Sequence, residues 1–359
     1  MLLILLWIVI AAIVILFLAL LALKNDTFYI AKFLRSNQER TSFCFIKNDT
    51  TMIALEENRL MPLASTVKIL IAIEYVRQVE SGKLDRNEKI GLIDIERFYI
   101  KNTDGGAHPA WLKYMKKKHM ISNDSVTLHN VVRGMISHSS NANSEYLMFK
   151  LGIDNINTGI KNIKIVDHTP IYPFVSSLLN CSLNKTKSPS EFEVELKELS
   201  MEEYIFKANY YHDSLRMLEK NELPVEIENI PLSIQKIWSD RLPASSAQEY
   251  AKLMNKINAY PFFDTSSANY LKELLKPQKD FINDAKLITT YGTKGGSTAF
   301  VLTKASFLTD NNKNNYSMAL FFKDLKDWES IILQWNLIRF EKKMFFDTVF
   351  REKVINYLR

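Results

Sequence analysis

The chain has 359 residues, of which 47% are apolar and 24% charged, and its formal net charge is +6. This length and apolar content predict a globular protein with a sizeable core, built as one large two-lobed domain or two smaller ones. The positive charge suits an anionic neighbour such as a membrane surface or a wall polymer, or simply reflects a Lys-rich composition. We find no nucleic-acid motif and no Arg-rich helix, so nucleic acid is set aside as a partner.

Residues 1–23 carry no charge and are long enough to cross a bilayer as a helix. A cleaved signal peptide has a basic start and a shorter apolar run, so we expect an uncleaved transmembrane anchor, followed by a linker over residues 24–40. Long domains can cross a membrane despite flanking cations, and we expect residues 41–359 on the extracytoplasmic side of the cell membrane. The positive-inside tendency points the other way, because four cations follow the span: Lys24, Lys32, Arg35 and Arg40.

Two strands are predicted at residues 41–46 and 51–55, with turn residues between them. Residues 61–68 follow, with the sequence Met-Pro-Leu-Ala-Ser-Thr-Val-Lys, and lead into a helix that is apolar nearly all round and ends near residue 82. A helix with this composition is buried. Ser65 therefore opens a buried helix, with Lys68 three residues on and on the same face.

Ser65 and Lys68 are a candidate nucleophile and base. Burial lowers the pKa of a lysine, so its amine can accept a proton near neutral pH, and a serine hydroxyl becomes a good nucleophile when a neighbouring base takes its proton. The alternative is an ordinary N-capping serine. The same triplet recurs in polar surroundings at residues 182–185 and 233–236.

The middle of the chain is mostly helical. Residues 103–111 form a turn cluster that carries a His and a Trp. This cluster either walls a cleft or is an ordinary surface turn. Helices are predicted at residues 126–136 and 144–151, separated by a polar segment that contains Ser139-Ser140-Asn141. A charged amphipathic stretch covers residues 191–204, and the segment that starts at Asp240 caps a helix over residues 247–257.

Three strand-like runs near the C-terminus cover residues 286–291, 299–303 and 316–322, and residues 327–358 close the chain as one or two amphipathic helices. Lys294-Gly295-Gly296 lies between the first two runs, where glycine marks either a close-approaching ligand or a bulge. This order predicts an antiparallel sheet built from both ends of the chain, flanked by helices, with an all-helical lobe inserted at about residues 85–245.

Three polar groups therefore stand at the edges of apolar elements: Ser65-x-x-Lys68, Ser139-Ser140-Asn141 and Lys294-Gly295-Gly296. Their order and context resemble the Ser-x-x-Lys, Ser-Asp-Asn and Lys-Thr-Gly motifs of the penicillin-recognising serine hydrolases, which include the class A β-lactamases and the DD-peptidases. The resemblance covers residues 41–359. It implies the two-lobed α/β fold of the β-lactamases and transpeptidases.

The resemblance also implies a role for each matching residue. Ser65 would be the nucleophile, Lys68 its base or proton relay, and Ser139 a proton shuttle to the leaving nitrogen. The substrate amide would bind Asn141. Lys294 would bind the substrate carboxylate and lower the pKa of Lys68, while Gly296 and Ser297 complete the substrate-binding set. The oxyanion hole would be the backbone N–H groups of Ser65 and Ser297.

The pattern departs from the family at three places. Ser140 stands where aspartate is usual, and Gly295 stands where a hydroxyl is usual, with Thr293, Ser297 and Thr298 as its possible replacements. Class A β-lactamases also carry a deacylating glutamate after the second motif. The nearest equivalents here are Glu193 and Glu195, which equally suit a solvated helix face. The 153-residue interval from Asn141 to Lys294 predicts an insertion in this region.

We therefore expect a membrane-anchored serine hydrolase that acts on β-lactams or on D-amino-acid amide bonds of peptidoglycan, with no metal and no organic cofactor. A slow-deacylating penicillin target is expected if the glutamate is absent. The alternative is a non-catalytic receptor or scaffold with the same fold. Cys44 and Cys181 either pair outside the cell or are two buried thiols.

Overall fold

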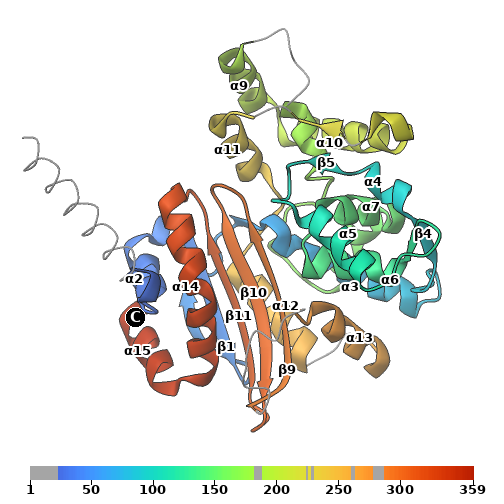
Figure 1. Cartoon of the computed structure of the whole chain (residues 1–359). Helices are drawn as coiled ribbons and strands as arrows, with labels where there is room; N and C mark the ends of the chain where they lie inside the picture. The colour runs from blue at the N-terminus through green and yellow to red at the C-terminus, as the bar shows by residue number, and fades with distance from the viewer. Residues whose placement is uncertain (1–22, 182–187, 224, 228–229, 260–262, 278–286) are drawn as a thin grey trace, which may run out of the picture.

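The computed structural model describes residues 23–181, 188–223, 225–227, 230–259, 263–277 and 287–359 (Figure 1). The expected membrane span lies outside these residues, apart from Leu23. Within the described ranges, no helix combines the length and the apolar character that a bilayer crossing requires.

A five-stranded antiparallel sheet in the order β2-β1-β11-β10-β9 forms the centre of the molecule. As the sequence predicts, its strands come from both ends of the chain, with β2 and β9 at the edges. Their bounds are β1 Thr41–Lys47, β2 Thr50–Leu55, β9 Ile288–Ser297, β10 Leu302–Asp310 and β11 Asn315–Phe322.

Strand β9 is longer than predicted and includes the third motif, Lys294 to Gly296. The predicted strand over residues 299–303 instead starts at Leu302, because Thr298 N–H bonds Val301 O at 2.9 Å and closes a turn between β9 and β10. The motif therefore lies on an edge strand, where one side of the backbone is free of a neighbouring strand.

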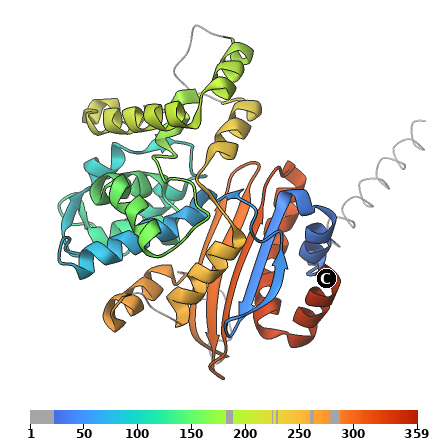
Figure 2. The same cartoon turned by 180° about the vertical axis from the view of Figure 1, so that it is seen from behind.

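Helices cover both faces of the sheet (Figures 1 and 2). On one face, α2 Tyr29–Ser36, α14 Asp327–Phe346 and α15 Thr348–Leu358 bury an apolar core that includes Phe43, Leu320 and Phe340. On the other face, α12 Ala247–Ala259 packs on β11, β1 and β10. The helical lobe lies on the same side of the sheet as α12 (Figures 1 and 2). The predicted C-terminal amphipathic region is thus two helices.

Helix α2 differs from the expected linker over residues 24–40. Ile30, Ala31, Phe33 and Leu34 are buried against the sheet, so this segment is part of the folded body. The sequence did not predict this helix because only one face of it is apolar and it has only two turns.

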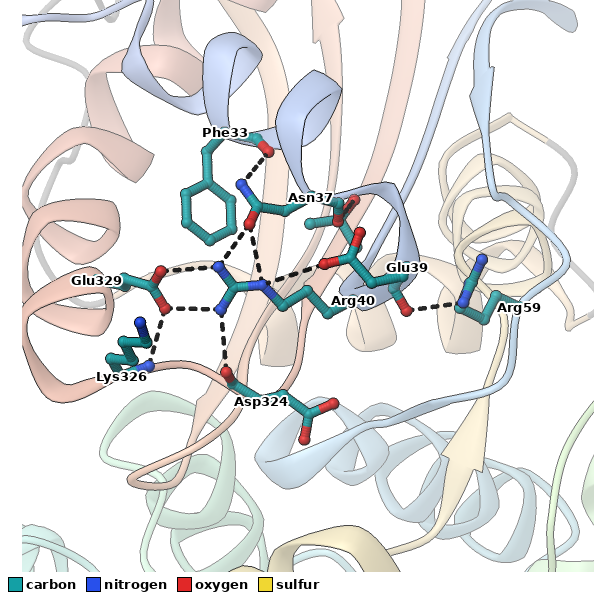
Figure 3. A network of polar contacts seen from close by, with 9 residues as sticks. Phe33, Asn37, Glu39, Arg40, Arg59, Asp324, Lys326 and Glu329 are labelled. Atoms are coloured by element: carbon teal, nitrogen blue, oxygen red, sulfur yellow. Dashed lines mark hydrogen bonds and ion pairs between the residues drawn. The ribbon is translucent and has the colours of Figure 1, made fainter.

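An ion pair joins the start of β1 to the start of α14 (Figure 3). The Arg40 guanidinium donates to both carboxylate oxygens of Glu329 at 2.7 Å and to Asp324 O at 3.0 Å. Only 16% of the Arg40 side chain and 5% of the Glu329 side chain are exposed. The bidentate geometry fixes the first turn of α14 beside the sheet.

The helical lobe is organised around α3 Lys68–Glu80, which is buried along most of its length, as predicted. Helix α3 packs on α6, α7 and α8, so the lobe begins before the predicted boundary at about residue 85. The predicted helices at 126–136 and 144–151 are observed as α6 and α7, and the amphipathic stretch becomes α9 and α10. The remaining helices are α4 Leu92–Glu96, α5 Ala107–Lys117, α6 Leu128–Ser137, α7 Asn141–Leu151, α8 Ile153–Asn162, α9 Pro189–Glu198, α10 Met201–Arg216, α11 Leu232–Arg241 and α13 Thr265–Leu275.

Short elements complete the fold. In the described part of the chain, two-stranded pairs join β3 to β8, β4 to β6 and β5 to β7. Their bounds, with those of the 3-10 turns, are β3 Met61–Pro62, β4 Lys89–Gly91, β5 Ile100–Lys101, β6 Ser125–Thr127, β7 Val225–Glu226, β8 Ala244–Ser245, η1 Gln38–Arg40, η2 Ala64–Val67, η3 Ser176–Cys181 and η4 Lys220–Glu222.

Cys44 is a free thiol on β1 and is fully buried. Burial, and then the charge of Glu57, raise the pKa of its thiol to about 12, so it stays protonated and unreactive. For Cys44 the structure therefore favours the buried thiol over the disulfide.

Candidate active site

Ser65 lies in the 3-10 turn η2, and α3 begins three residues later, at Lys68. The prediction that Ser65 opens the helix is corrected by this short turn, and the N-capping alternative is wrong because Ser65 caps neither element. Pairing of β3 with β8 and the bond from Leu63 N–H to Pro243 O at 2.9 Å hold the chain just before the turn. Ala64 has a φ of +44°, a strained value for a non-glycine residue.

The edge strand β9 packs directly against the backbone of Ser65. A Cβ added at Gly296 would lie 2.4 Å from Ser65 N and 2.9 Å from Thr66 N, so only glycine fits there. Thr303 on β10, a residue that the motifs did not predict, links the sheet to the segment around Ser65. Its hydroxyl donates to Leu63 O at 2.8 Å and lies 2.6 Å from the Thr66 hydroxyl.

Lys68 is completely buried and lies beside the second motif. Its Nζ donates to Ser139 O at 2.7 Å and to Asn141 Oδ1 at 2.9 Å, and lies 3.5 Å from Ser139 Oγ. Burial lowers the pKa of Lys68 to about 7, against the opposing charges of Asp104 and Glu145. The amine is therefore partly neutral at pH 7, as the sequence predicts. No hydrogen bond joins it to Ser65 Oγ among the described contacts.

Ser139 lies between two amines. It occupies the turn from α6 to α7 with a left-handed φ of +68°. Lys294 Nζ donates to Ser139 Oγ at 2.9 Å and to Gly295 O at 2.7 Å. A hydroxyl between two lysines is well placed to pass a proton from one site to another.

Burial, then the positive charges of Lys68 and Lys304, lower the pKa of Lys294 well below its ordinary value of 10.5. The sequence predicted that Lys294 lowers the pKa of Lys68. In the structure burial is the main cause of the lowered pKa of both Lys68 and Lys294.

Both ends of the side-chain amide of Asn141 form hydrogen bonds. Its Oδ1 accepts from Lys68 at 2.9 Å, and its Nδ2 donates to Thr103 O at 3.1 Å. Asn141 therefore orients Lys68 in addition to the predicted contact with substrate.

Ser140, the residue at the aspartate position, belongs to a buried network that the sequence did not reveal. Its hydroxyl accepts from Asn143 N–H at 3.2 Å, which caps α7, and lies 2.9 Å from Nδ1 of His108. The other ring nitrogen, Nε2, lies 3.1 Å from Glu96 Oε1. His108 and Trp111 are both buried, so the surface-turn interpretation of residues 103–111 is wrong for these two side chains.

One cavity of about 600 Å³ brings the predicted residues together. Ser65, Ser139, Asn141, Gly296 and Ser297 line it, while Lys68 and Lys294 reach it from behind through Ser139. The turn before α5 supplies part of the wall, as the cleft interpretation predicted: Thr103, Asp104 and Gly105.

The inserted helices also supply part of this wall. Gln235 and Trp238 on α11 line it, as do Phe174 and Val175. Trp238 Nε1–H donates to Phe174 O at 2.8 Å, and the buried carboxylate of Glu145 accepts from Val175 N–H at 3.0 Å. The 174–175 segment is thus held from both sides.

Among the described lining residues, Asp104 is the only carboxylate. Its oxygens cap α5 by accepting from the backbone N–H groups of Ala107 and His108, each at 3.0 Å. Glu193 is on the surface of α9 and pairs with Lys197, and Glu195 lines a separate cavity. Of the two interpretations, the solvated face is the one observed for Glu193. The described residues also contain no group of His, Cys, Asp or Glu that could hold a metal.

Comparison with known proteins places this site in a family. The model of the Beta-lactamase enzyme family matches residues 27–334. No curated protein sequence matches the chain. A class A β-lactamase from Bacteroides cellulosilyticus is similar in structure, with a TM-score of 0.53 at 16% identity, covering 86% of this chain and 95% of that one.

Two other solved structures show the same fold. A β-lactamase from Sphaerobacter thermophilus has a TM-score of 0.54 at 15% identity, covering 88% of this chain and 97% of that one. A mutant of PBP-A, solved as an acyl-enzyme complex with penicillin G, has a TM-score of 0.52 at 15% identity, covering 88% of this chain and 95% of that one. With its fold and its match over most of its length, the chain belongs to the Beta-lactamase enzyme family of penicillin-recognising serine hydrolases.

Proposed function

We propose that this protein is a membrane-anchored, extracytoplasmic serine hydrolase that forms an acyl-enzyme on Ser65. Its substrates are β-lactams or D-amino-acid amide bonds of peptidoglycan peptides, and it releases a β-lactam acyl group slowly. The observation that carries the last point is the described cavity wall, whose only carboxylate, Asp104, is committed to capping α5.

Acylation follows from the positions of the two lysines. Neutral Lys68 accepts the Ser65 proton as the hydroxyl attacks the amide carbonyl. That proton then passes through Ser139 Oγ, which lies 3.5 Å from Lys68 Nζ, to the leaving nitrogen. Lys294, 2.9 Å from the same hydroxyl, holds the substrate carboxylate nearby.

The developing oxyanion would lie between η2 and β9. Ser297 follows Gly296 on β9, whose backbone packs against that of Ser65, and both serines line the same cavity. Backbone N–H groups of Ser65 and Ser297 are therefore suited to donate to the oxyanion, as the family resemblance implies.

Deacylation needs a base that activates water, and the described wall offers none comparable to the class A glutamate. The 174–175 segment presents a Phe and a Val. A penicilloyl group on Ser65 is therefore expected to persist, which favours a peptidase-like penicillin target over an efficient β-lactamase.

Labelling with a fluorescent penicillin tests this function. We expect wild type to carry the label for hours and Ser65→Ala to carry none. Label lost within seconds to minutes indicates a β-lactamase instead. No label on the wild type favours the non-catalytic receptor, which the absent hydroxyl at Gly295 would suit.

The anchor and its orientation rest on the charge-free residues 1–23. Two of the cations that argue for a cytoplasmic domain are used in the fold, because Lys32 pairs with Asp26 and Arg40 with Glu329, each at 2.7 Å. A C-terminal reporter that is active only outside the cytoplasm tests the orientation. An active fusion is expected, and an inactive but stable fusion would contradict it.

A further inference from the structure

Helix α14 exposes an apolar stripe on the face that points away from the sheet. Trp328, Ile331, Trp335 and Ile338 follow one another at helical spacing and are 53%, 48%, 38% and 45% exposed. The opposite side of the helix is buried, through residues that include Leu333, Leu337 and Phe340. The helix is thus apolar on two sides, and only one side is covered by the described protein.

The described part of the chain begins, at Leu23, beside this stripe. The carbonyl of Leu23 accepts from the buried side chain of Asn336 at 2.8 Å, and Asn25 Oδ1 accepts from Arg339 at 3.2 Å. Between them, Lys24 Nζ lies 5.6 Å from the centre of the Trp335 ring. Residues 23–25, which directly follow the apolar residues 1–22 in the sequence, are therefore bound to the middle of α14.

We propose that the exposed stripe of α14 lies on the surface of a lipid bilayer, with the Trp and Ile side chains in the interfacial region. This inference rests on the proposed anchor. A bilayer that holds residues 1–22 begins where Leu23 is bonded to α14, so no linker separates the stripe from the membrane. Tryptophan favours this interface, and an anionic leaflet attracts the neighbouring Lys24 and Arg339.

The placement has a consequence for the active site. Ile338 belongs to the stripe and also lines the 600 Å³ cavity, together with Gln334 and Leu337 of the same helix. One end of the cavity therefore lies at the bilayer surface. A substrate that is itself held close to the membrane reaches Ser65 from that end.

Tryptophan fluorescence of the full chain in vesicles tests the proposal. The protein carries Trp7→Phe, so that the N-terminal segment does not report, and the vesicles contain phosphatidylcholine and phosphatidylglycerol with brominated acyl chains. We expect bromine to quench roughly half of the emission of Trp328 and Trp335, obtained as the difference from a Trp328→Phe/Trp335→Phe variant. Trp111 and Trp238 are common to both proteins, so their emission cancels in the difference.

A matched control places a tryptophan at another exposed apolar site. Phe206 on α10 is 73% exposed, and both views show α10 away from α14 (Figures 1 and 2). Phe206→Trp, added to the variant without Trp328 and Trp335, is expected to respond to aqueous iodide and not to brominated lipid.

Each other outcome overturns the proposal. If the protein binds vesicles but iodide quenches Trp328 and Trp335, the anchor is present and the stripe of α14 faces water. Stripe tryptophans that respond to neither quencher are covered by protein, such as a second copy. Protein that fails to float with vesicles lacks both the anchor and the membrane face.

Discussion

At the scale of single residues, the protonation of Lys68 controls the chemistry. Its pKa is lowered to about 7 by burial, and only its neutral form can accept the Ser65 proton. The acylation rate constant for penicillin is therefore expected to rise as the pH increases through about 7 and then level off. Stopped-flow labelling measures it. Lys68→Arg stays protonated and should acylate very slowly at all these pH values, whereas a flat wild-type profile would argue against Lys68 as the base.

Gly295 and Gly296 form a matched pair for testing the packing of β9 on η2. Gly296→Ala would push its methyl group into the backbone of Ser65, whose N atom would be 2.4 Å away. A displacement of this kind costs roughly a hundredfold in acylation rate. At Gly295 the nearest atom to the methyl is Thr303 O at 3.3 Å, so Gly295→Ala should stay within about tenfold of wild type. Equal effects of the two changes would disprove this packing argument.

Ser140 depends on His108 for its position. His108→Ala removes the ring beside Ser140 Oγ and leaves a buried hydroxyl with one partner fewer, which should slow acylation roughly tenfold. Adding Ser140→Asp restores the residue that is usual in the family and a good cap for α7, so the double variant should recover most of the rate.

Penicillin acylation kinetics separate binding from chemistry in this test. The loss is expected in the acylation rate constant, with little change in the dissociation constant of the initial complex. Wild-type kinetics in His108→Ala, or a double variant slower than the single one, would show that the network does not position Ser139 and Asn141.

At the scale of elements, the Arg40–Glu329 pair should stabilise the junction of β1 with α14. Arg40→Met leaves a nearly buried carboxylate without its partner, which should lower the free energy of unfolding by about 3 kcal/mol. The control is Lys32→Met, which breaks the more exposed pair with Asp26 and should cost at most about 1 kcal/mol. Urea unfolding in mild detergent measures both, and equal losses would contradict the assignment.

The same pair predicts how stability changes with pH. Burial raises the pKa of Glu329, but hydrogen bonds from Arg40 and from the backbone of Lys326 outweigh it, and the net pKa lies below 4.5. A carboxyl with a lowered pKa contributes its full stability above the unfolded value and loses it as the pH falls through the folded value. This contribution is therefore expected to be present at neutral pH and lost below about pH 4.5.

Much of the element order could be predicted from the sequence, because long apolar runs fix the type of α3, β1 and β11. The boundaries near the site could not. Helical spacing does not distinguish the 3-10 turn at Ser65 from the first turn of α3, and the strand β9 continues through glycines that carry no apolar pattern. Helix α2 is predicted as a linker because its four buried residues form too short an apolar run, over residues 30–34, to mark a helix.

At the scale of the whole molecule, the three motifs predicted which residues meet in one cavity but not what surrounds them. The Glu96–His108–Ser140 network joins residues up to 44 positions apart, and no local pattern links them. The contribution of α11 to the cavity wall and the exposure of the apolar stripe on α14 also depend on tertiary packing, which the sequence does not show. The absence of a glutamate from the described wall became visible only when Glu193 and Glu195 were located outside it.

The most direct test of a long-lived acyl-enzyme on Ser65 is intact-protein mass spectrometry after penicillin G is added and then removed. The account predicts a mass increase of one penicilloyl group, located on the peptide that contains Ser65 and still present after hours. An adduct on another residue, no adduct at all, or complete loss within minutes would contradict it.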